Sequence, residues 1–505
     1  MLRLVAGAVT ALVMADTVAT TLAMPILSRD PVVRAVPLSE LNLMTTANLA
    51  TIAALLVSGG RLADLIGRRI VLAVGAAAFA VGALLVTFGP FWPVLLAGRL
   101  VQGAGSALML PAALGLLLGQ CDERRRPGAV ALWGAATGVG GLVMHAAGGF
   151  FLDAYGWRLL YLPHGLTAIA LLLLVKVLPM AQLHRHRAPD LVGTLSLITA
   201  TAALVLVVTY GARWGWTSLI TLITTITMIS AGGLALARSR RHPAGAIDME
   251  LWRSPGVRWG AFISLLYGVM AFALLNLVPM ALGEQGLSTG RIGLTLAPLS
   301  AAVTLASPLV APLVRRVGLL PTVYVGAFLS GTGFLLLIVV PVTSGPGLAT
   351  LILLGVGFGL VSTTATVTGT LDTGTEGYAA AVGTLTTARI LGGAIGSAAA
   401  AAYLTDVPKP AALAYHDVIA GGIAVAVLLG TCALIRAVRQ RRPTVPGHSA
   451  ALQAEIERLR TALRRQQVRL RTIARTAEDE LTALSDPRRT RPPAPDPVAP
   501  PEGTA

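Results

Sequence analysis

The chain has 505 residues, of which 55% are hydrophobic and only 12% are charged, and its mean hydropathy is +0.75. Soluble chains carry about 25% charged residues, so this composition excludes a soluble enzyme for most of the length. The net charge of +16 does not indicate nucleic-acid binding, because the arginines lie between apolar runs and form no single basic face.

Apolar runs recur over roughly the first 440 residues, and each is long enough to cross a hydrocarbon core about 30 Å thick. The first run is too long for a signal-peptide core and holds Asp16 in its middle, so we interpret it as an uncleaved first helix. The pattern predicts an all-α integral membrane protein. We expect fourteen transmembrane helices, near 4–27, 41–60, 70–90, 92–118, 128–150, 157–178, 191–210, 216–237, 258–282, 290–314, 321–341, 346–371, 379–403 and 415–437.

The distribution of lysine and arginine predicts how the helices are oriented, since basic loops are retained in the cytoplasm. With the N-terminus inside, the cytoplasmic connections hold sixteen basic residues and the outer connections hold six. Both termini are therefore expected in the cytoplasm. An even number of spans and a basic stretch after the last one agree with this orientation.

A weak internal sequence repeat predicts how the chain is divided. The sequence Ala311-Pro-Leu-Val-Arg315-Arg-Val-Gly318 follows the similar stretch that begins at Gly60 by 251 residues, and transporter folds are commonly built from such repeats. We predict a six-helix bundle (1–190), two linker helices and a loop (191–257), a second six-helix bundle (258–437), a cytoplasmic basic helix (438–485) and a disordered proline-rich tail (486–505).

The first span reads Asp16-Thr-Val-Ala-Thr-Thr-Leu-Ala-Met-Pro25. An ionisable residue at this depth is costly and is a functional candidate by default. A buried carboxylate that only stabilises packing is the alternative interpretation of Asp16.

The connection between the second and third spans, residues 60–72, reads GRLADLIGRRIVL. Its glycines allow a tight crossing, Asp64 offers a negative charge to a helix N-terminus, and the arginines can hold anionic groups or lipid phosphate. A generic basic loop is the alternative. The segment resembles the loop signature of the major facilitator superfamily, at the place where that family carries it. The resemblance covers about residues 1–437, implies that family's fold, and marks Gly60, Asp64, Gly67, Arg68 and Arg69 as a conformational-switch loop.

Two further segments resemble the fourteen-helix drug/proton antiporter branch of that superfamily. The stretch around Asp16 is similar to its Asp-x-Thr…Ala-Leu-Pro signature, with Thr20 in place of the usual Asn. Span four carries Arg99-Leu-Val-Gln102-Gly103, similar to the branch's Arg-x-x-Gln-Gly. Asp16 lies roughly 18 Å above the cytoplasmic start of its helix and Arg99 roughly 12 Å below the outer start of its own. Their depths coincide, so an Asp16–Arg99 pair with Gln102 beside it is predicted to couple proton and substrate.

Span five departs from the antiporter signature Gly-x-x-x-Gly-Pro-x-x-Gly-Gly. Here the segment is Gly140-Gly-Leu-Val-Met144-His145-Ala-Ala-Gly148-Gly149. Without the proline, the helix is expected to bend less. His145 is either a second proton carrier or a neutral histidine that is hydrogen-bonded within the bundle. The sequence does not distinguish these two hypotheses.

Small residues in several spans predict close contact between helices. The segment from Gly383 to Gly396 resembles the corresponding late span of the family. Acids that some relatives place in spans ten and thirteen are absent, which leaves Asn276 and Arg389 as the polar residues of that half. The predicted helix-contact glycines are Gly103, Gly148, Gly149, Gly392, Gly393 and Gly396.

Beyond the last span, apolar residues recur at alternating spacings of four and three residues from Leu452 to Ala477. Gln466 occupies one of the positions on this apolar face. This heptad pattern predicts a helix that pairs with a partner, for example as a coiled coil between two copies. Its other face is rich in arginine, so an amphipathic helix on anionic lipid and a solvated, unpaired helix are the alternatives.

Together these features predict a multi-pass protein of the cytoplasmic membrane that exports amphipathic small molecules in exchange for protons. The proton gradient supplies the energy, and no cofactor, metal site or catalytic group is expected. Two other functions remain open: a facilitator or importer of another solute, and a transport-deficient scaffold or sensor that acts through the C-terminal helix. The sequence does not identify the substrate, because apolar drug pockets are tolerant.

Overall fold

The computed structural model describes residues 2–33, 36–119, 121, 126–177, 190–242, 245–247, 249–371, 378–406 and 411–441, together with Arg458 and Gln466. All regular elements in these ranges are helical. The first part contains α1 (Leu2–Leu27), α2 (Leu38–Leu41), α3 (Leu43–Ile66), α4 (Arg68–Phe88), α5 (Trp92–Gly119), α6 (Arg126–Val143), the π-helical turn η2 (Met144–Gly148) and α7 (Gly149–Val175).

The remaining elements follow in the same order as the predicted spans. They are α8 (Leu191–Trp214), α9 (Leu219–Arg241), η3 (Leu251–Arg253), α10 (Pro255–Glu284), α11 (Thr289–Ala306), η4 (Ser307–Leu309), α12 (Val310–Val317), α13 (Leu319–Val339), α14 (Gly345–Leu371), α15 (Tyr378–Asp406) and α16 (Ala411–Arg441).

Local sequence explains where several helices begin and end. Ser218, Ser254 and Ser288 are N-caps whose side chains accept a hydrogen bond from the backbone N–H three residues later, which satisfies a donor that the helix itself leaves free. Gly67 separates α3 from α4 with a φ of 105°, a conformation that glycine adopts without steric cost.

Twelve helical segments among the described residues are long and apolar enough to cross a membrane. One of them, Trp133–Val175, has 43 residues, about twice the length that a single span needs. Gly156 interrupts it with φ 77° and ψ 169°. The chain is therefore a multi-pass protein of the cell membrane with about twelve apolar spanning helices.

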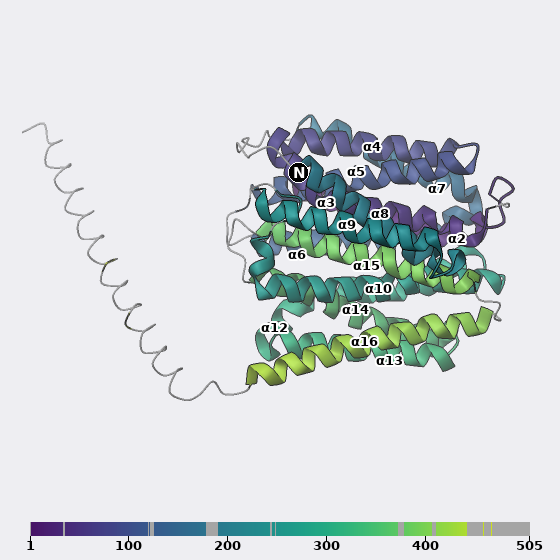
Figure 1. The fold of residues 1–505 in the computed structure, drawn as a ribbon. Helices are drawn as coiled ribbons and strands as arrows, with labels where there is room; N and C mark the ends of the chain where they lie inside the picture. Colours follow the sequence, from purple (N-terminus) through teal and green to yellow (C-terminus); the bar gives the residue numbers. More distant parts are fainter. Residues whose placement is uncertain are drawn as a thin grey trace, which may run out of the picture. The chain divides into compact units, whose positions relative to one another are not determined.

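The helices that precede α8 pack mainly on one another, and so do those that follow α9 (Figure 1). In the first set, α5 lies against α3 and α4, while α7 lies against α4 and α1 lies against α6. In the second set, α14 contacts α10, α11 and α13, and α10 also contacts α15. The two sets meet where α3 contacts α15, where α11 contacts α6, η2 and α7, and where α1 contacts α10.

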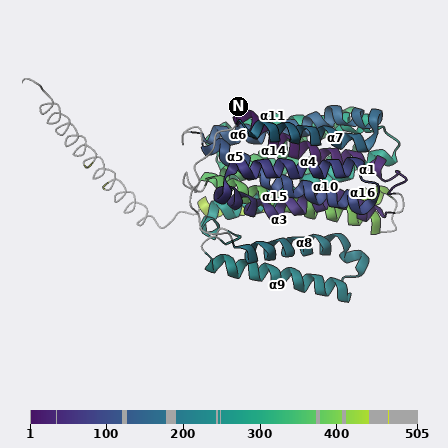
Figure 2. The ribbon, with the colours of Figure 1, turned by 90° about the horizontal axis from the view of Figure 1, so that it is seen from above.

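Helices α8 and α9 form a separate pair along one side of the bundle (Figure 2). The pair contacts the rest through α8, which packs on α3 and α15. Only 17% and 11% of the most apolar windows of α8 and α9 are buried, against 72% in α5 and α10. Their apolar side chains therefore face outward, where lipid would cover them.

Residues Met1–Ala437 form one compact unit, and Val438–Ala505 form another. The predicted heptad helix and proline-rich tail lie outside the described residues, apart from Arg458 and Gln466. The predicted pairing of that helix and the division of the first unit into two bundles remain predictions.

Candidate functional site

A buried carboxylate, guanidinium and amide meet inside the first set of helices. Nη1 of Arg99 donates to both carboxylate oxygens of Asp16, at 3.0 Å and 2.8 Å, and to Oε1 of Gln102 at 2.7 Å. Nε2 of Gln102 donates to Oδ1 of Asp16 at 3.1 Å. The structure thus brings together the three residues that the sequence places at one depth, because α1 and α5 pack against each other.

Neighbouring groups hold Arg99 in this orientation. Its Nε donates to the Met44 carbonyl at 2.7 Å, and Nδ2 of Asn48 donates to the Arg99 carbonyl at 3.2 Å. Its Cζ lies 5.6 Å from the centroid of the Tyr161 ring, a distance at which a cation is attracted to the ring face. The Tyr161 hydroxyl in turn donates to Oγ1 of Thr20 at 3.1 Å. Met44, Asn48 and Tyr161 were not among the predicted site residues, because their contacts cross between helices.

The charges of this cluster are removed from water. Asp16 is 1% exposed, and Arg99 and Gln102 are 0% exposed. Such a pair is tolerated because each charge neutralises the other, and removal of one partner leaves a costly unpaired charge.

His145 lies on the π-helical turn η2, at the place where the sequence lacks the family's proline. The helix is therefore irregular at this point. We had expected it to be straighter, because the proline of the family is absent. Nδ1 of His145 is 2.8 Å from Oγ of Ser300 in α11, and its Nε2 has no hydrogen-bond partner among the described residues. His145 thus joins the two sets of helices and does not contact the Asp16 cluster.

The predicted switch loop lies where α3 ends and α4 begins. Nη1 of Arg68 donates to the Gly115 carbonyl, and Nη2 of Arg69 donates to the Lys176 carbonyl. Gly60 lies against Pro111. The side chain of Asp64 is outside the described part of the structure.

Five of the six predicted contact glycines lie against another helix. Gly103 faces the Asn48 carbonyl, Gly149 the Thr289 carbonyl, Gly392 the Leu265 carbonyl, Gly393 the Phe272 ring and Gly396 the Val269 carbonyl. A side chain at these positions would collide with the neighbouring helix. Gly148 instead lies against the Met144 side chain of its own turn.

A carboxylate that the sequence did not single out links the two sets at the start of α11. Asp153 of α7 accepts hydrogen bonds from the backbone N–H groups of Thr289 and Gly290, at 2.9 Å and 2.7 Å, and from Oγ1 of Thr289 at 2.5 Å. These groups begin α11, so Asp153 caps a helix of the other set. Nearby, Nη2 of Arg29 donates to the Gly283 carbonyl at 3.0 Å. An acidic residue just before Gly156 and the Ser-Thr-Gly start of α11 were the available signals in the sequence.

Asn276, a polar residue identified in the sequence analysis, also links helices by a hydrogen bond. Its Nδ2 donates to Oγ of Ser397 at 2.8 Å, and the Ser397 carbonyl accepts from Nδ2 of Asn42 at 3.0 Å. Polar side chains from α10, α15 and the start of α3 therefore meet where the two sets of helices touch.

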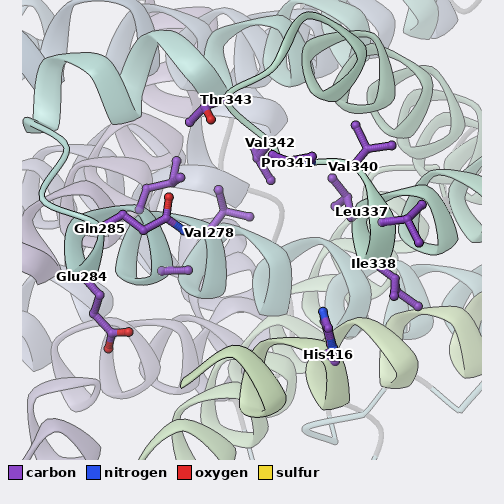
Figure 3. Close-up of a pocket in the computed structure, with 13 residues that line it drawn as sticks. Val278, Glu284, Gln285, Leu337, Ile338, Val340, Pro341, Val342, Thr343 and His416 are labelled. Carbon is purple, nitrogen blue, oxygen red and sulfur yellow. The ribbon is translucent and has the colours of Figure 1, made fainter. Parts of the chain in front are cut away.

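The second set of helices holds a cavity where α10 and α13 end, shown in Figure 3. It has a volume of about 440 Å³ and lies between the ends of α10 and α13, residues 340–343 and His416 of α16. A smaller cavity of about 160 Å³ lies deeper between α10, α13, α15 and α16, and is lined mainly by apolar residues. Neither contains a predicted coupling residue, so the Asp16 cluster is a closed polar centre and these cavities are separate features.

Comparisons with known proteins agree with this architecture. The model of a family described as the Major Facilitator Superfamily matches residues 6–397. The multidrug resistance protein Stp of Mycobacterium tuberculosis is 30% identical over 292 residues, a match that spans 57% of this chain and only 54% of that protein. The cephamycin export protein CmcT of Amycolatopsis lactamdurans is 29% identical over 404 residues, or 77% of this chain and 81% of CmcT. The solved structure of the POT family transporter PepTSo has a similar fold, with a TM-score of 0.60 at 14% identity over 86% of this chain and 98% of that one.

Proposed function

Since the chain belongs to the major facilitator superfamily, we propose that it is a proton-coupled exporter of amphipathic small molecules across the cytoplasmic membrane. The names of Stp and CmcT support export of antibiotics or other drugs. The buried Asp16–Arg99 pair, at 2.8 Å, is the observation that carries the coupling part of the proposal.

Asp16 is the proposed proton carrier. A carboxylate at mid-membrane is costly unless it is paired, and Arg99 and Gln102 supply that pairing here. Protonation weakens its attraction for Arg99 and favours the conformation in which substrate and proton change sides. His145, which bonds Ser300 across the two sets, is proposed to lie at the moving contact.

The proposed topology has fourteen spans in a six plus two plus six arrangement, with both termini in the cytoplasm. The break at Gly156 supports counting Trp133–Val175 as two spans. Helix α15 has 29 residues and packs between α3 and α10, which supports counting it as a further span. The pair α8 and α9 supplies the central two. In this topology the loop with Gly67 lies on the cytoplasmic side and switches with the transport cycle.

Transport into everted membrane vesicles tests the proposal. Respiration acidifies the vesicle interior, and a panel of fluorescent amphipathic dyes and antibiotics is supplied outside. We expect at least one compound to accumulate against its gradient, and an uncoupler should abolish the accumulation. Accumulation that an uncoupler leaves unchanged would favour a facilitator, and equal levels in vesicles with and without the protein would overturn export.

Asp16→Asn isolates the coupling step. The amide retains the shape of the carboxylate but cannot exchange a proton, so we expect uphill accumulation to be lost while exchange of labelled for unlabelled substrate persists. The matched control is Asp190→Asn. Asp190 is a buried aspartate at the start of α8 that pairs with Arg238 of α9, and this variant should transport normally. Uphill transport at the wild-type rate by Asp16→Asn would contradict the proton-carrier role.

Deletion of residues 448–505 tests the predicted coiled-coil segment. Unchanged transport in the truncated protein would favour an accessory role for this segment. Lost assembly or signalling with normal transport would indicate a scaffold function.

A further inference from the structure

Arg389 is an interior arginine of α15 that the coupling mechanism does not use. Its Cζ lies 5.9 Å from the centroid of the Tyr267 ring in α10, and its Nε is buried without a hydrogen-bond partner among the described residues. Arg389 lies roughly 17 Å along α15 from its first residue, at 1.5 Å per residue, so its side chain branches from the middle of the span.

No carboxylate in the described ranges pairs with Arg389, whereas Arg99 is paired with Asp16. An unpaired guanidinium at this depth is costly, and attraction to one ring face offsets only part of that cost. Arginine also remains charged in any protein environment. Among the described residues, Arg389 therefore lacks the counter-charge that Asp16 gives to Arg99.

Two hydroxyl groups on α10 and α14 also lack partners. Oγ of Ser264 in α10 and Oγ1 of Thr364 in α14 are buried without hydrogen bonds among the described residues, and the two residues are 1% and 0% exposed. Buried hydroxyls are ordinarily hydrogen-bonded, so these two are available to a ligand that supplies acceptors.

Helix contacts place these groups along two turns of α10, about 12 Å, with Ser264 midway. Gly268, one turn from Ser264, lies against the Arg389 carbonyl. Gly260, one turn from Ser264 on the other side, lies against the carbonyl of Ala365, the residue that follows Thr364. Helices α10, α14 and α15 therefore each contribute a hydrogen-bond donor to the same part of the bundle.

We propose that Arg389, assisted by Ser264 and Thr364, binds the carboxylate of an amphipathic anionic substrate. A guanidinium and two hydroxyls match the acceptor oxygens of a carboxylate. Tyr267 contacts Phe358 edge-on at 5.7 Å, and Phe358 lies 6.1 Å from Phe334, so aromatic rings flank the apolar part of the same molecule. The inference deepens the proposed export function by assigning the substrate class.

Binding to the full-length protein in lipid nanodiscs tests this assignment without requiring transport. The probes are labelled octanoate, 2-naphthoate and 9-anthroate, each compared with its primary amide at a pH where the acids are ionised. We expect at least one carboxylate to bind saturably and its amide to bind about ten- to hundredfold more weakly, as the loss of a hydrogen bond to a charged group implies. Equal affinity for acid and amide, or no binding of any of the three acids, would overturn the proposal.

Substitutions then assign the contact. Arg389→Gln should reduce carboxylate affinity to that of the amide while amide binding, which reports an intact fold, stays unchanged. Ser264→Ala and Thr364→Val should each weaken the acid several-fold. The matched control is Arg436→Gln, because Arg436 also lies over an aromatic ring, with Cζ 5.2 Å from the Trp259 centroid, and it should leave the preference intact. Wild-type carboxylate preference in Arg389→Gln would refute the site.

The two proposals fail in different ways. Asp16→Asn should retain carboxylate binding and lose uphill transport. If the wild-type protein binds carboxylates but never accumulates a compound, the export function fails and the Arg389 site stands. If it accumulates neutral or cationic compounds without binding carboxylates, the Arg389 site fails and the export function stands.

Discussion

Arg99 and Arg389 are two interior arginines of the same membrane protein with similar aromatic neighbours and opposite electrostatic surroundings. Each lies over a tyrosine ring, with Cζ 5.6 Å from the Tyr161 centroid and 5.9 Å from the Tyr267 centroid. Arg99 is matched by Asp16 and Gln102, whereas Arg389 has no acidic partner among the described residues. Among the described residues, the first set of helices therefore supplies the counter-charge of its own arginine, whereas the proposed substrate carboxylate would supply that of Arg389.

Removal of Arg99 should have the largest effect on stability. Arg99→Met leaves Asp16 buried without its cation, and loss of one partner of a buried pair costs about 3–5 kcal/mol. Thermal unfolding of the purified protein in nanodiscs measures this loss. The double variant Asp16→Asn/Arg99→Met should recover much of it, and a double variant as unstable as Arg99→Met alone would show that charge pairing is not the cause.

Removal of Arg389 should act in the opposite direction. Arg389→Met eliminates an unpaired charge at mid-span, a charge whose insertion costs about 2.5–3.5 kcal/mol, so we expect a stability equal to wild type or higher by up to about 2 kcal/mol. The same unfolding assay measures it, with Arg436→Met as the control. Destabilisation as large as that of Arg99→Met would mean that Arg389 is paired within the protein and would remove the contrast.

The hydrogen bonds of Asp153 that link the two sets of helices should matter less. Their loss should change the free energy of unfolding less than substitution of either interior arginine. Asp153→Asn removes the charge that caps α11 from α7, and a capping interaction is worth about 1 kcal/mol. Thr289→Val removes only the hydroxyl donor to Asp153 and should cost less in the same unfolding measurement. An equal loss in both variants would point to Thr289 packing as the cause.

An Arg–Asp pair at the edge of the bundle should matter least and should depend on pH. Asp190 accepts from Nη2 of Arg238 at 2.8 Å and from the Gly193 N–H at 2.9 Å, and these bonds hold the pKa of its carboxyl below the ordinary value. Because the pKa is lowered in the folded state, this stabilisation is present at neutral pH and is lost as pH falls below the ordinary value and through the lowered one.

Asp190→Asn should therefore cost only roughly 0.5 kcal/mol at pH 7, because the Arg238 side chain is 41% exposed and solvent screens the pair. The difference in unfolding free energy between wild type and variant should shrink as the pH approaches 3. A difference that stays constant over this range would show that the carboxylate charge is not responsible.

Much of the fold could be predicted from the sequence, because a membrane constrains the length and composition of every span. The order of the helices and the residues at the centre of spans one and four followed from apolar runs and from the rise of a helix. The cap by Asp153 and the contact of His145 with Ser300 could not be read in this way, because both join residues more than a hundred positions apart.

The sequence by itself determined that this chain is a multi-pass helical membrane protein of the major facilitator type and that Asp16 and Arg99 lie at one depth. Only the tertiary structure decided which polar groups touch. Depth along a helix follows from residue number, whereas rotation about the helix axis and the choice of neighbour depend on packing against other helices. For that reason two arginines that look alike in the sequence differ in charge balance, with one neutralised by α1 and the other left to an external partner.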